Sequence, residues 1–111
     1  AESTGTRQLS GVGGQMDFLE GAYRSKGGKG FICINSSRVT KDGERKSNIL
    51  ATIPGGSTIS APRTMIQYVA TEYGIASLSG KTLRERAEAM ASIAHPDFRE
   101  ELMKYARENF K

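Results

Sequence analysis

A proline inside a helical pattern most strongly limits what this chain can fold into. Apolar residues follow Thr82 at helical spacing as far as His95, where Pro96 interrupts the pattern. The residue before a proline is driven out of helical geometry, whereas proline itself fits the first turn of a helix. Thr82 and Glu85 have the spacing of a capping box, which marks a helix start. The last third of the chain therefore predicts two consecutive helices, one after Thr82 and one beginning at Pro96.

Apolar stripes support these two helices, because residues three and four apart share one helical face. In the first helix the stripe is Leu83, Ala87, Met90, Ala91 and Ala94. In the second helix it is Phe98, Leu102, Tyr105 and Ala106. We expect both stripes to face the core.

Short apolar runs in the rest of the chain predict strands. The continuous run 31–34 is typical of a strand buried on both faces. Three further runs are strand candidates: 48–53, 57–60 and 66–71. A short helix is expected over 17–25, and 36–47 is interpreted as a polar loop that turns at Asp42 and Gly43. Short central strands flanked by helices indicate the α/β class.

The composition argues against several classes of protein. The chain has 111 residues, which suits one small domain. No apolar run approaches the roughly 20 residues of a membrane span, and the first residues carry no secretory signal pattern. The single cysteine, Cys33, cannot form an internal disulfide and is expected to be a buried thiol in a reducing compartment. We therefore expect a cytoplasmic protein with no membrane partner.

Positive charge is concentrated in one segment. The formal net charge of the chain is +4, and the segment 24–46 alone carries seven cations against two acids. These cations are Arg24, Lys26, Lys29, Arg38, Lys41, Arg45 and Lys46. Such a cluster suits phosphate groups, and a solvated loop would have the same composition. Charge alone does not choose between these two interpretations.

Two glycine-containing motifs resemble nucleotide sites but fail in their spacing. After Gly11 and Gly13, the dinucleotide fingerprint requires a glycine where this chain has Met16. Gly74 and Gly80 enclose five residues, whereas the phosphate-binding P-loop requires four. Neither motif therefore predicts a nucleotide site.

Two single residues could serve either a site or the fold. Glu72 ends the strand predicted at 66–71, at the edge where α/β proteins bind ligands, and a structural hydrogen-bond acceptor is the preferred interpretation. His95 is the only histidine and is expected to cap or pack rather than catalyse. A nucleic-acid module interleaves cations with aromatics, and only Tyr23 and Phe31 lie near the basic segment, so we expect no nucleic-acid partner.

Three stretches of the sequence together resemble one known family. They are SGVGGQMDFLEGAYRSKGGKG (10–30), YVATEYGIASLSGKTLRERA (68–87) and IAHPDFREEL (93–102). In order and spacing they are similar to the C-terminal region of the acetyl-CoA hydrolase/transferase family, which includes 4-hydroxybutyrate, butyrate and acetate CoA-transferases. The 4-hydroxybutyrate type is the most similar, and the resemblance covers nearly the whole chain.

The resemblance implies that residues 1–111 are a single partial domain, the C-terminal portion of the second CoA-transferase domain, with a NagB/RpiA-like α/β fold. Members transfer CoA between short-chain acyl-CoA and a carboxylate through a glutamyl-CoA thioester. Their nucleophilic glutamate precedes the glycine-rich stretch, and no glutamate of this chain matches its motif, so no catalytic residue is expected here. The expected partners are acyl-CoA, a short-chain carboxylate, upstream domains of the same protein and further copies in a homo-oligomer, with no metal.

The resemblance also implies that part of the coenzyme A site lies in this chain. Lys41 matches a CoA-binding lysine of the family, and Arg38 is the alternative because the loop alignment is loose. A cation there suits the diphosphate or the 3′-phosphate of CoA. At Asn35 and Arg38 the chain departs from the proline and small residues usual in the family. The remaining expected cofactor-binding residues form the glycine loop: Ser10, Gly11, Gly13 and Gly14.

Three functions fit these observations. The first is part of a CoA-transferase, and the second is an acetyl-CoA hydrolase of the same family, in which water replaces the acceptor acid. The third is a non-enzymatic basic binding module. The first two differ in the acceptor, whose binding residues are expected outside this chain.

Overall fold

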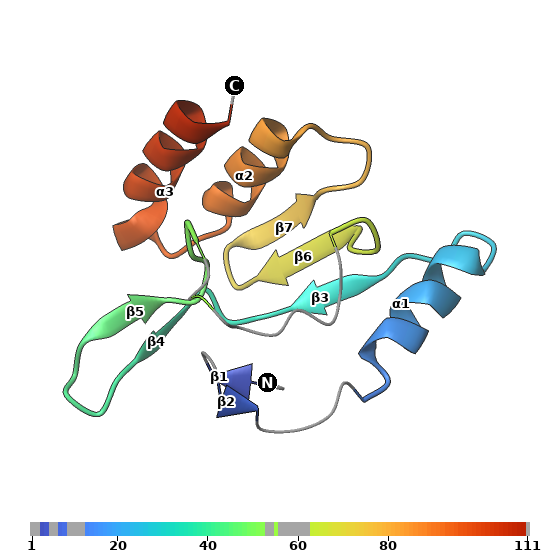
Figure 1. Cartoon of the computed structure of the whole chain (residues 1–111), viewed down its shortest axis with the longest axis horizontal. Helices are drawn as coiled ribbons and strands as arrows, with labels where there is room; N and C mark the ends of the chain where they lie inside the picture. The colour runs from blue at the N-terminus through green and yellow to red at the C-terminus, as the bar shows by residue number, and fades with distance from the viewer. Residues whose placement is uncertain (1–2, 5–6, 9–12, 53–54, 56–62, 111) are drawn as a thin grey trace.

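The computed structural model describes residues 3–4, 7–8, 13–52, 55 and 63–110. Figure 1 shows a small central sheet with helices beside it and a hairpin extending away from it. The strands are β1 (Ser3–Thr4), β2 (Arg7–Gln8), β3 (Phe31–Cys33), β4 (Ser37–Val39), β5 (Arg45–Ser47), β6 (Tyr68–Thr71) and β7 (Gly74–Ser77). The helices are α1 (Gln15–Arg24), α2 (Leu83–Ser92) and α3 (Pro96–Asn109).

The central sheet has the order β3-β6-β7, with β3 parallel to β6 and β7 antiparallel to it. Ile32, Val69 and Ala76 are aligned across the three strands and therefore point to the same face. Val69 and Ala76 are buried, whereas Phe31 and Ile75 on the opposite face are exposed. One face of the sheet therefore builds the core.

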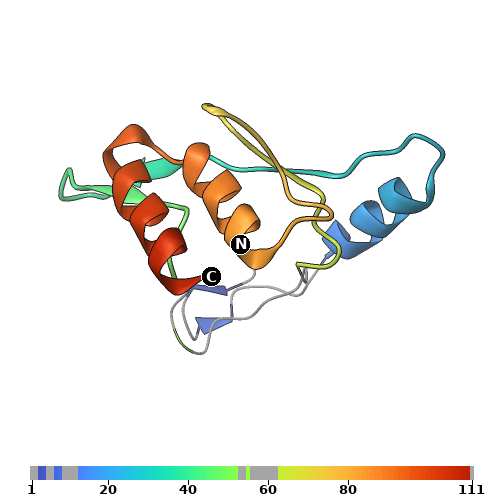
Figure 2. The ribbon, with the colours of Figure 1, turned by 90° about the horizontal axis from the view of Figure 1, so that it is seen from above.

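Helices α2 and α3 cover that buried face. Figure 2, seen from above, shows both helices on one side of the sheet, with α1 on the same side farther along. The buried centre of the core comes from the sheet, the segment after β5 and the α2–α3 corner: Ile49, Val69, Ala76, Leu78, Ile93 and Ala94. Met90 and Leu102, from the predicted apolar stripes, pack against it. The observed α/β fold confirms the predicted class.

The two predicted helices begin where the sequence places their caps. The Thr82 hydroxyl accepts a hydrogen bond from the Glu85 N–H at 3.2 Å, and the Glu85 carboxylate accepts one from the Thr82 N–H at 3.1 Å. This reciprocal pair is a complete capping box. Nδ1 of His95 accepts a hydrogen bond from the Asp97 N–H at 3.2 Å, so His95 caps α3 as expected.

Helix α1 stands apart from α2 and α3, beside the start of β3 (Figure 1). Its buried residue is Leu19. Gly28, in the connection to β3, allows a close backbone approach, because a Cβ at this position would collide with the Ala22 carbonyl oxygen. This tight turn brings the chain back along α1. The helix predicted over 17–25 is confirmed, with a start two residues earlier.

The structure corrects the prediction for 36–47, which is not a loop. It forms the antiparallel hairpin β4–β5, with Arg38 paired to Lys46. Asp42 and Gly43 do lie in its turn, where Gly43 has a φ of +82° and donates to the Thr40 carbonyl at 2.9 Å. Few apolar residues mark these strands, and pairing between the two strands, rather than burial, makes them.

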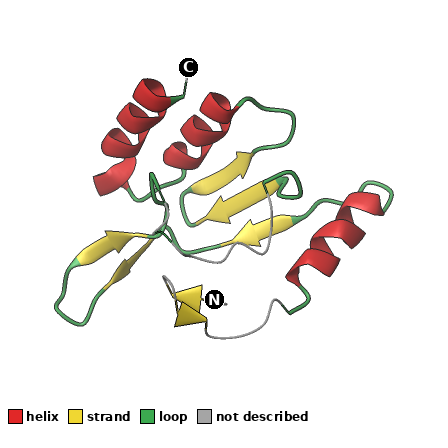
Figure 3. Cartoon of the chain, in the orientation of Figure 1, coloured by secondary structure: helices red, strands yellow, loops and turns green. Residues whose placement is uncertain are grey.

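Figure 3 shows the observed strands in yellow, and the other strand predictions had mixed outcomes against them. The strand predicted over 66–71 is confirmed as β6, while 48–52 is irregular rather than a strand. The candidate at 57–60, like residue 53, lies outside the described residues. Strand β7 was not predicted. Its residues lie in the segment that was compared with a P-loop, and Gly80 lies in a turn before α2.

The prediction that 31–34 is buried on both faces is wrong. Phe31 and Cys33 are exposed, and only the face of β3 that carries Ile32 packs on the core. The reason is that no described element packs on the other face of the sheet. The Cys33 thiol is therefore exposed rather than buried. Among the described helices, none has the length and apolar character to cross a membrane.

Candidate functional site

The described part of the glycine loop leads directly into α1. Gly13 has a φ of +62°, a conformation that disfavours residues with a Cβ. Gly14 is the N-cap of α1, and its carbonyl accepts from the Phe18 N–H at 3.1 Å. Gly14 supplies no side-chain cap, and both glycines are exposed. Ser10 and Gly11 lie outside the described residues.

The cations of the hairpin are exposed on both of its strands and in its turn. Arg38 lies at the centre of β4, and its Nη1 donates to Oδ1 of Asn48 at 2.6 Å. Lys41 lies in the turn, and Arg45 donates to the Ser37 hydroxyl at 2.7 Å. Within the described part of the chain, no carboxylate lies within ion-pair distance of these three cations. The hairpin therefore presents to solvent three cations that make no ion pair with the described residues.

The glycine loop and the hairpin do not lie together. Figures 1 and 2 agree in placing the start of α1 and the hairpin at opposite ends of the central sheet. The longest dimension of the molecule, 42 Å, runs through both regions. The described residues thus show two separate candidate regions instead of one pocket. Their assignment to a single CoA site stays a prediction.

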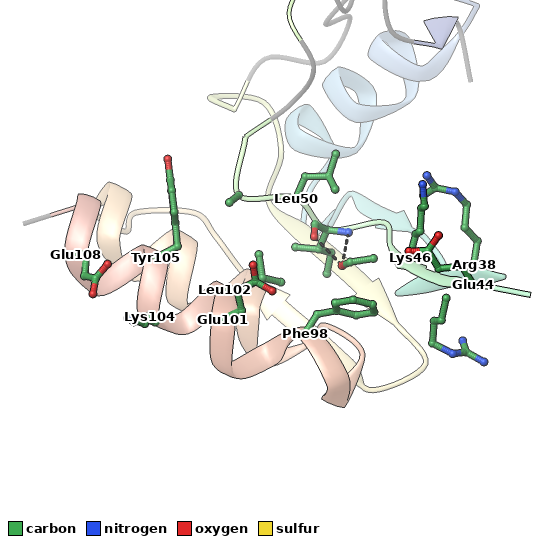
Figure 4. A pocket seen from close by; sticks show the side chains of 14 residues that line it. Arg38, Glu44, Lys46, Leu50, Phe98, Glu101, Leu102, Lys104, Tyr105 and Glu108 are labelled. Carbon is green, nitrogen blue, oxygen red and sulfur yellow. Dashed lines mark hydrogen bonds between the residues drawn. The ribbon is translucent and has the colours of Figure 1, made fainter. Parts of the chain in front are cut away.

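A groove of about 520 Å³ lies between the hairpin side of the molecule and α3 (Figure 4). Its apolar residues include Ile49, Leu50 and Leu102, and Phe98 points into it. Its charged residues are Arg38, Glu44, Arg45, Lys46, Glu101, Lys104 and Glu108. Sequence reasoning missed this groove, because it assigned Phe98 and Tyr105 only to the apolar stripe of the last helix, whereas both line the groove. Its mixed charges do not by themselves select an anion.

The carboxyl ends of the parallel strands β3 and β6 meet at another hollow, of about 380 Å³. Its lining comes from Cys33 to Asn35 and from Ala70 to Glu72. Oε1 of Glu72 accepts a hydrogen bond of 2.8 Å from the Ser36 N–H, which confirms the expected structural acceptor. The hydroxyl and the N–H of Ser36 lower the pKa of Glu72 below its ordinary value. Glu72 is therefore a carboxylate at neutral pH.

Ser36 itself is buried, and its hydroxyl oxygen makes no hydrogen bond of acceptable geometry with the described residues. The Ser36 hydroxyl adds to the N–H in lowering the pKa of Glu72, and the backbone N–H is the group that makes the well-formed hydrogen bond. The side chains described here also contain no group of three histidines, cysteines or carboxylates that could hold a metal ion.

Comparison with known proteins identifies the family. A profile of the acetyl-CoA hydrolase/transferase C-terminal domain matches residues 1–106. This chain belongs to that family. Its membership confirms the resemblance that the three sequence stretches carry, and it accounts for the α/β fold of the central sheet and its helices.

Three similar members of the family are two curated relatives compared by sequence and one relative whose structure is solved. The butyryl-CoA:acetate CoA-transferase of Anaerostipes caccae is 49% identical over 96% of this chain, and the 4-hydroxybutyrate coenzyme A transferase of Clostridium kluyveri is 48% identical over 99%. The 4-hydroxybutyrate CoA-transferase of Porphyromonas gingivalis is 45% identical, with a TM-score of 0.62 over 87% of this chain and 23% of that one. The chain spans 24% and 25% of the length of the two curated relatives.

Hydrolases of the family are more distant. The acetyl-CoA hydrolase of Kluyveromyces lactis is 32% identical over 92% of this chain and 18% of its own length. The CoA-transferases named above are therefore the more similar group.

Proposed function

We propose that this chain is the C-terminal, coenzyme A-binding part of a CoA-transferase. The observation that carries the proposal is the 48–49% identity to two CoA-transferases over nearly the whole chain, against 32% to a hydrolase. The substrate would be a short-chain acyl-CoA such as acetyl-, butyryl- or 4-hydroxybutyryl-CoA. The acceptor would be a short-chain carboxylate.

The proposed reaction uses a glutamate carboxylate as the nucleophile, which divides one exchange into easier steps. The carboxylate attacks the thioester carbonyl, the C–S bond breaks, and the CoA thiolate leaves an acyl-glutamyl anhydride. The thiolate then attacks the glutamyl carbonyl, which releases the first carboxylic acid as its carboxylate and forms a glutamyl-CoA thioester. The acceptor carboxylate reverses both steps. No electrons are exchanged and no proton is consumed.

The nucleophile itself is proposed to lie outside these 111 residues. Glu20 pairs with Arg24 at 2.7 Å on the exposed face of α1. Glu72 is already engaged by Ser36, and Glu44 is exposed near the hairpin turn. None of these carboxylates has the free, enclosed position that a nucleophile toward a thioester requires.

The hairpin is proposed to hold phosphate groups of CoA. Arg38 and Lys41 are exposed and lack carboxylate partners among the described residues, so binding a phosphate would not have to break an ion pair. Arg38 has the further advantage that Asn48 fixes one of its nitrogens. Charge-assisted contacts of this kind are stronger than neutral ones. The glycine loop would offer backbone amides to another part of the cofactor.

The test is a two-substrate kinetic series in an enzyme of full family length that carries this chain as its C-terminal part. We expect Arg38→Ala or Lys41→Ala to raise the KM for acyl-CoA by up to about tenfold, or roughly 1.4 kcal/mol. The KM for the acceptor acid should change little, because it carries no phosphate. Lys81→Ala, at an exposed cation between the turn at Gly80 and the start of α2, is the matched control. Unchanged acyl-CoA kinetics in both hairpin variants would show that the hairpin is a solvated loop that does not bind the phosphate groups of CoA.

The reaction class has a separate test in the same enzyme. A transferase consumes acyl-CoA only when an acceptor acid is present and converts that acid to a new acyl-CoA with little free CoA, whereas a hydrolase releases free CoA at the same rate without an acceptor. The 111-residue chain alone should show neither activity, because the nucleophile is proposed to lie elsewhere. Turnover by the purified chain would contradict that placement.

A further inference from the structure

A hydrogen-bond network fastens the base of the β4–β5 hairpin to the central sheet. The Glu72 carboxylate, just after β6, accepts from the backbone N–H of Ser36, just before β4. The two residues are 36 positions apart in the sequence. Ser36 is 1% exposed, so this bond is shielded on the Ser36 side. The carboxylate thus holds the first residue of the hairpin base against the carboxyl end of the sheet.

Asn48 closes the same base from the other strand. Its backbone N–H donates to the Ser36 carbonyl at 2.8 Å, and its Nδ2 donates to the Asn35 carbonyl at 2.8 Å. Its Oδ1 accepts from Nη1 of Arg38 at 2.6 Å. Asn48 therefore connects the hairpin base to a guanidinium in the middle of β4.

We propose that Glu72 and Asn48 are positioning residues that hold the hairpin base and thereby fix the Arg38 guanidinium for an anionic group of the acyl-CoA substrate. The inference rests on the proposed function for the identity of that anionic group. Neither residue has to touch substrate, because each acts through Arg38.

The physical reason is the entropy of a long side chain. A free arginine samples many rotamers, and ordering it on binding costs conformational entropy. The bond to Asn48 restricts Arg38 before any ligand arrives. Its other guanidinium N–H groups make no hydrogen bond with the described residues and can contact a phosphate, which arginine binds through two parallel bonds. Ser36 and Asn48 are in turn bound to each other, so movement at Ser36 would be transmitted to Asn48.

The hydrogen bonds that join Glu72, Ser36 and Asn48 at the hairpin base are here called the clamp. The first measurement uses the 111-residue chain and tests the clamp alone. Backbone amide hydrogen exchange at Ser36 and Asn48 is compared in the wild type, Glu72→Ala and Glu72→Gln. We expect Glu72→Ala to accelerate exchange at both amides by about tenfold, and Glu72→Gln to restore much of the protection, because its amide oxygen can still accept. Glu100→Ala, on the exposed surface of α3, is the control. Unchanged exchange at Ser36 in Glu72→Ala would overturn the clamp.

The second measurement uses the enzyme of full family length and asks whether the clamp acts through Arg38. We expect Glu72→Ala and Asn48→Ala to raise the KM for acyl-CoA about fivefold, with a smaller effect of Glu72→Gln. In an Arg38→Ala background the same substitutions should have almost no further effect on this KM. A merely structural role would instead give additive effects, and additivity would overturn the proposal.

The two measurements separate this proposal from the proposed function. An enzyme without CoA-transferase activity would refute the proposed function and the role toward acyl-CoA, while hydrogen exchange would still decide whether Glu72 holds Ser36. An active enzyme in which Arg38→Ala leaves the acyl-CoA kinetics unchanged would overturn the positioning role alone.

Discussion

The hydroxyl of Thr71 donates a hydrogen bond of 2.7 Å to the backbone carbonyl of Ile93. Thr71 ends β6, and Ile93 is the C-cap of α2. The same hydroxyl accepts from the Tyr73 N–H at 3.1 Å, so it also shapes the turn into β7. One side chain therefore joins the end of a strand to the corner between α2 and α3, close to the hollow that Glu72 lines.

We expect Thr71→Val to lower the free energy of unfolding by about 1–3 kcal/mol, because it keeps the shape but leaves the Ile93 carbonyl without its donor. Thr71→Ser keeps the hydroxyl and should lose less. Urea denaturation of the chain, followed by circular dichroism, measures both variants. Equal losses in the two variants would show that the hydroxyl does not stabilise the corner.

The core can be tested with two isoleucines of contrasting burial. Ile93 is 3% exposed and Ile75 is 61% exposed. Ile93→Ala should lower the free energy of unfolding by about 2–5 kcal/mol, the range for a buried aliphatic side chain replaced by alanine. Ile75→Ala should lower it by no more than about 0.5 kcal/mol. Thermal and urea unfolding provide the comparison, and a larger loss at Ile75 would place the core on the wrong face of the sheet.

The stability of the chain should fall in acid. The Ser36 hydroxyl and N–H lower the pKa of Glu72, and the Thr82 N–H and hydroxyl lower that of Glu85, both from an ordinary value of 4.5. A lowered folded pKa means that the carboxylate stabilises the fold fully above about pH 4.5, and this stabilisation is lost as pH falls through the folded pKa.

Urea titrations between pH 7 and pH 3 measure this effect. We expect little change from these two groups between pH 7 and pH 5 and a decline below. The double variant Glu72→Gln and Glu85→Gln should show a shallower decline, because neither glutamine titrates. An identical acid profile in the wild type and the double variant would refute a contribution from these carboxylates.

Two glycines should respond to alanine in opposite directions. Gly21 lies inside α1 with no atom within 4 Å of an added Cβ, so Gly21→Ala should stabilise the chain by about 0.5–1 kcal/mol. Gly80 has equally open space but a φ of +73°, so Gly80→Ala should destabilise it by about 1–2 kcal/mol. Differential scanning calorimetry measures both changes. Shifts of the same sign would mean that backbone conformation does not distinguish the two sites.

The helices were predictable from sequence because their signals are local. The capping box at Thr82 and the break at His95 and Pro96 act within one helical turn, and the structure shows both where they were expected. The hairpin was missed because its strands contain few apolar residues and owe their form to pairing between Arg38 and Lys46 and their neighbours. The prediction of a buried Cys33 failed because it assumed cover on both faces of β3.

The candidate site was predictable only in part. The sequence and its family resemblance identified Arg38, Lys41 and the glycine loop as cofactor-binding candidates, and Glu72 as a structural acceptor. They could not show that Asn48 fixes Arg38, or that the start of α1 and the hairpin lie at opposite ends of the sheet. Side-chain bonds of this kind depend on where separate segments meet.

By itself, the sequence determined the family, the fold class and the starts of α2 and α3, because these depend on residue identity and on interactions over three or four positions. Only the tertiary structure decided which face of the sheet is covered, which segments form the hairpin, and that Glu72 holds Ser36. The physical reason is distance along the chain. A hydrogen bond between residues 36 positions apart exists only after the sheet has brought the ends of β3 and β6 together.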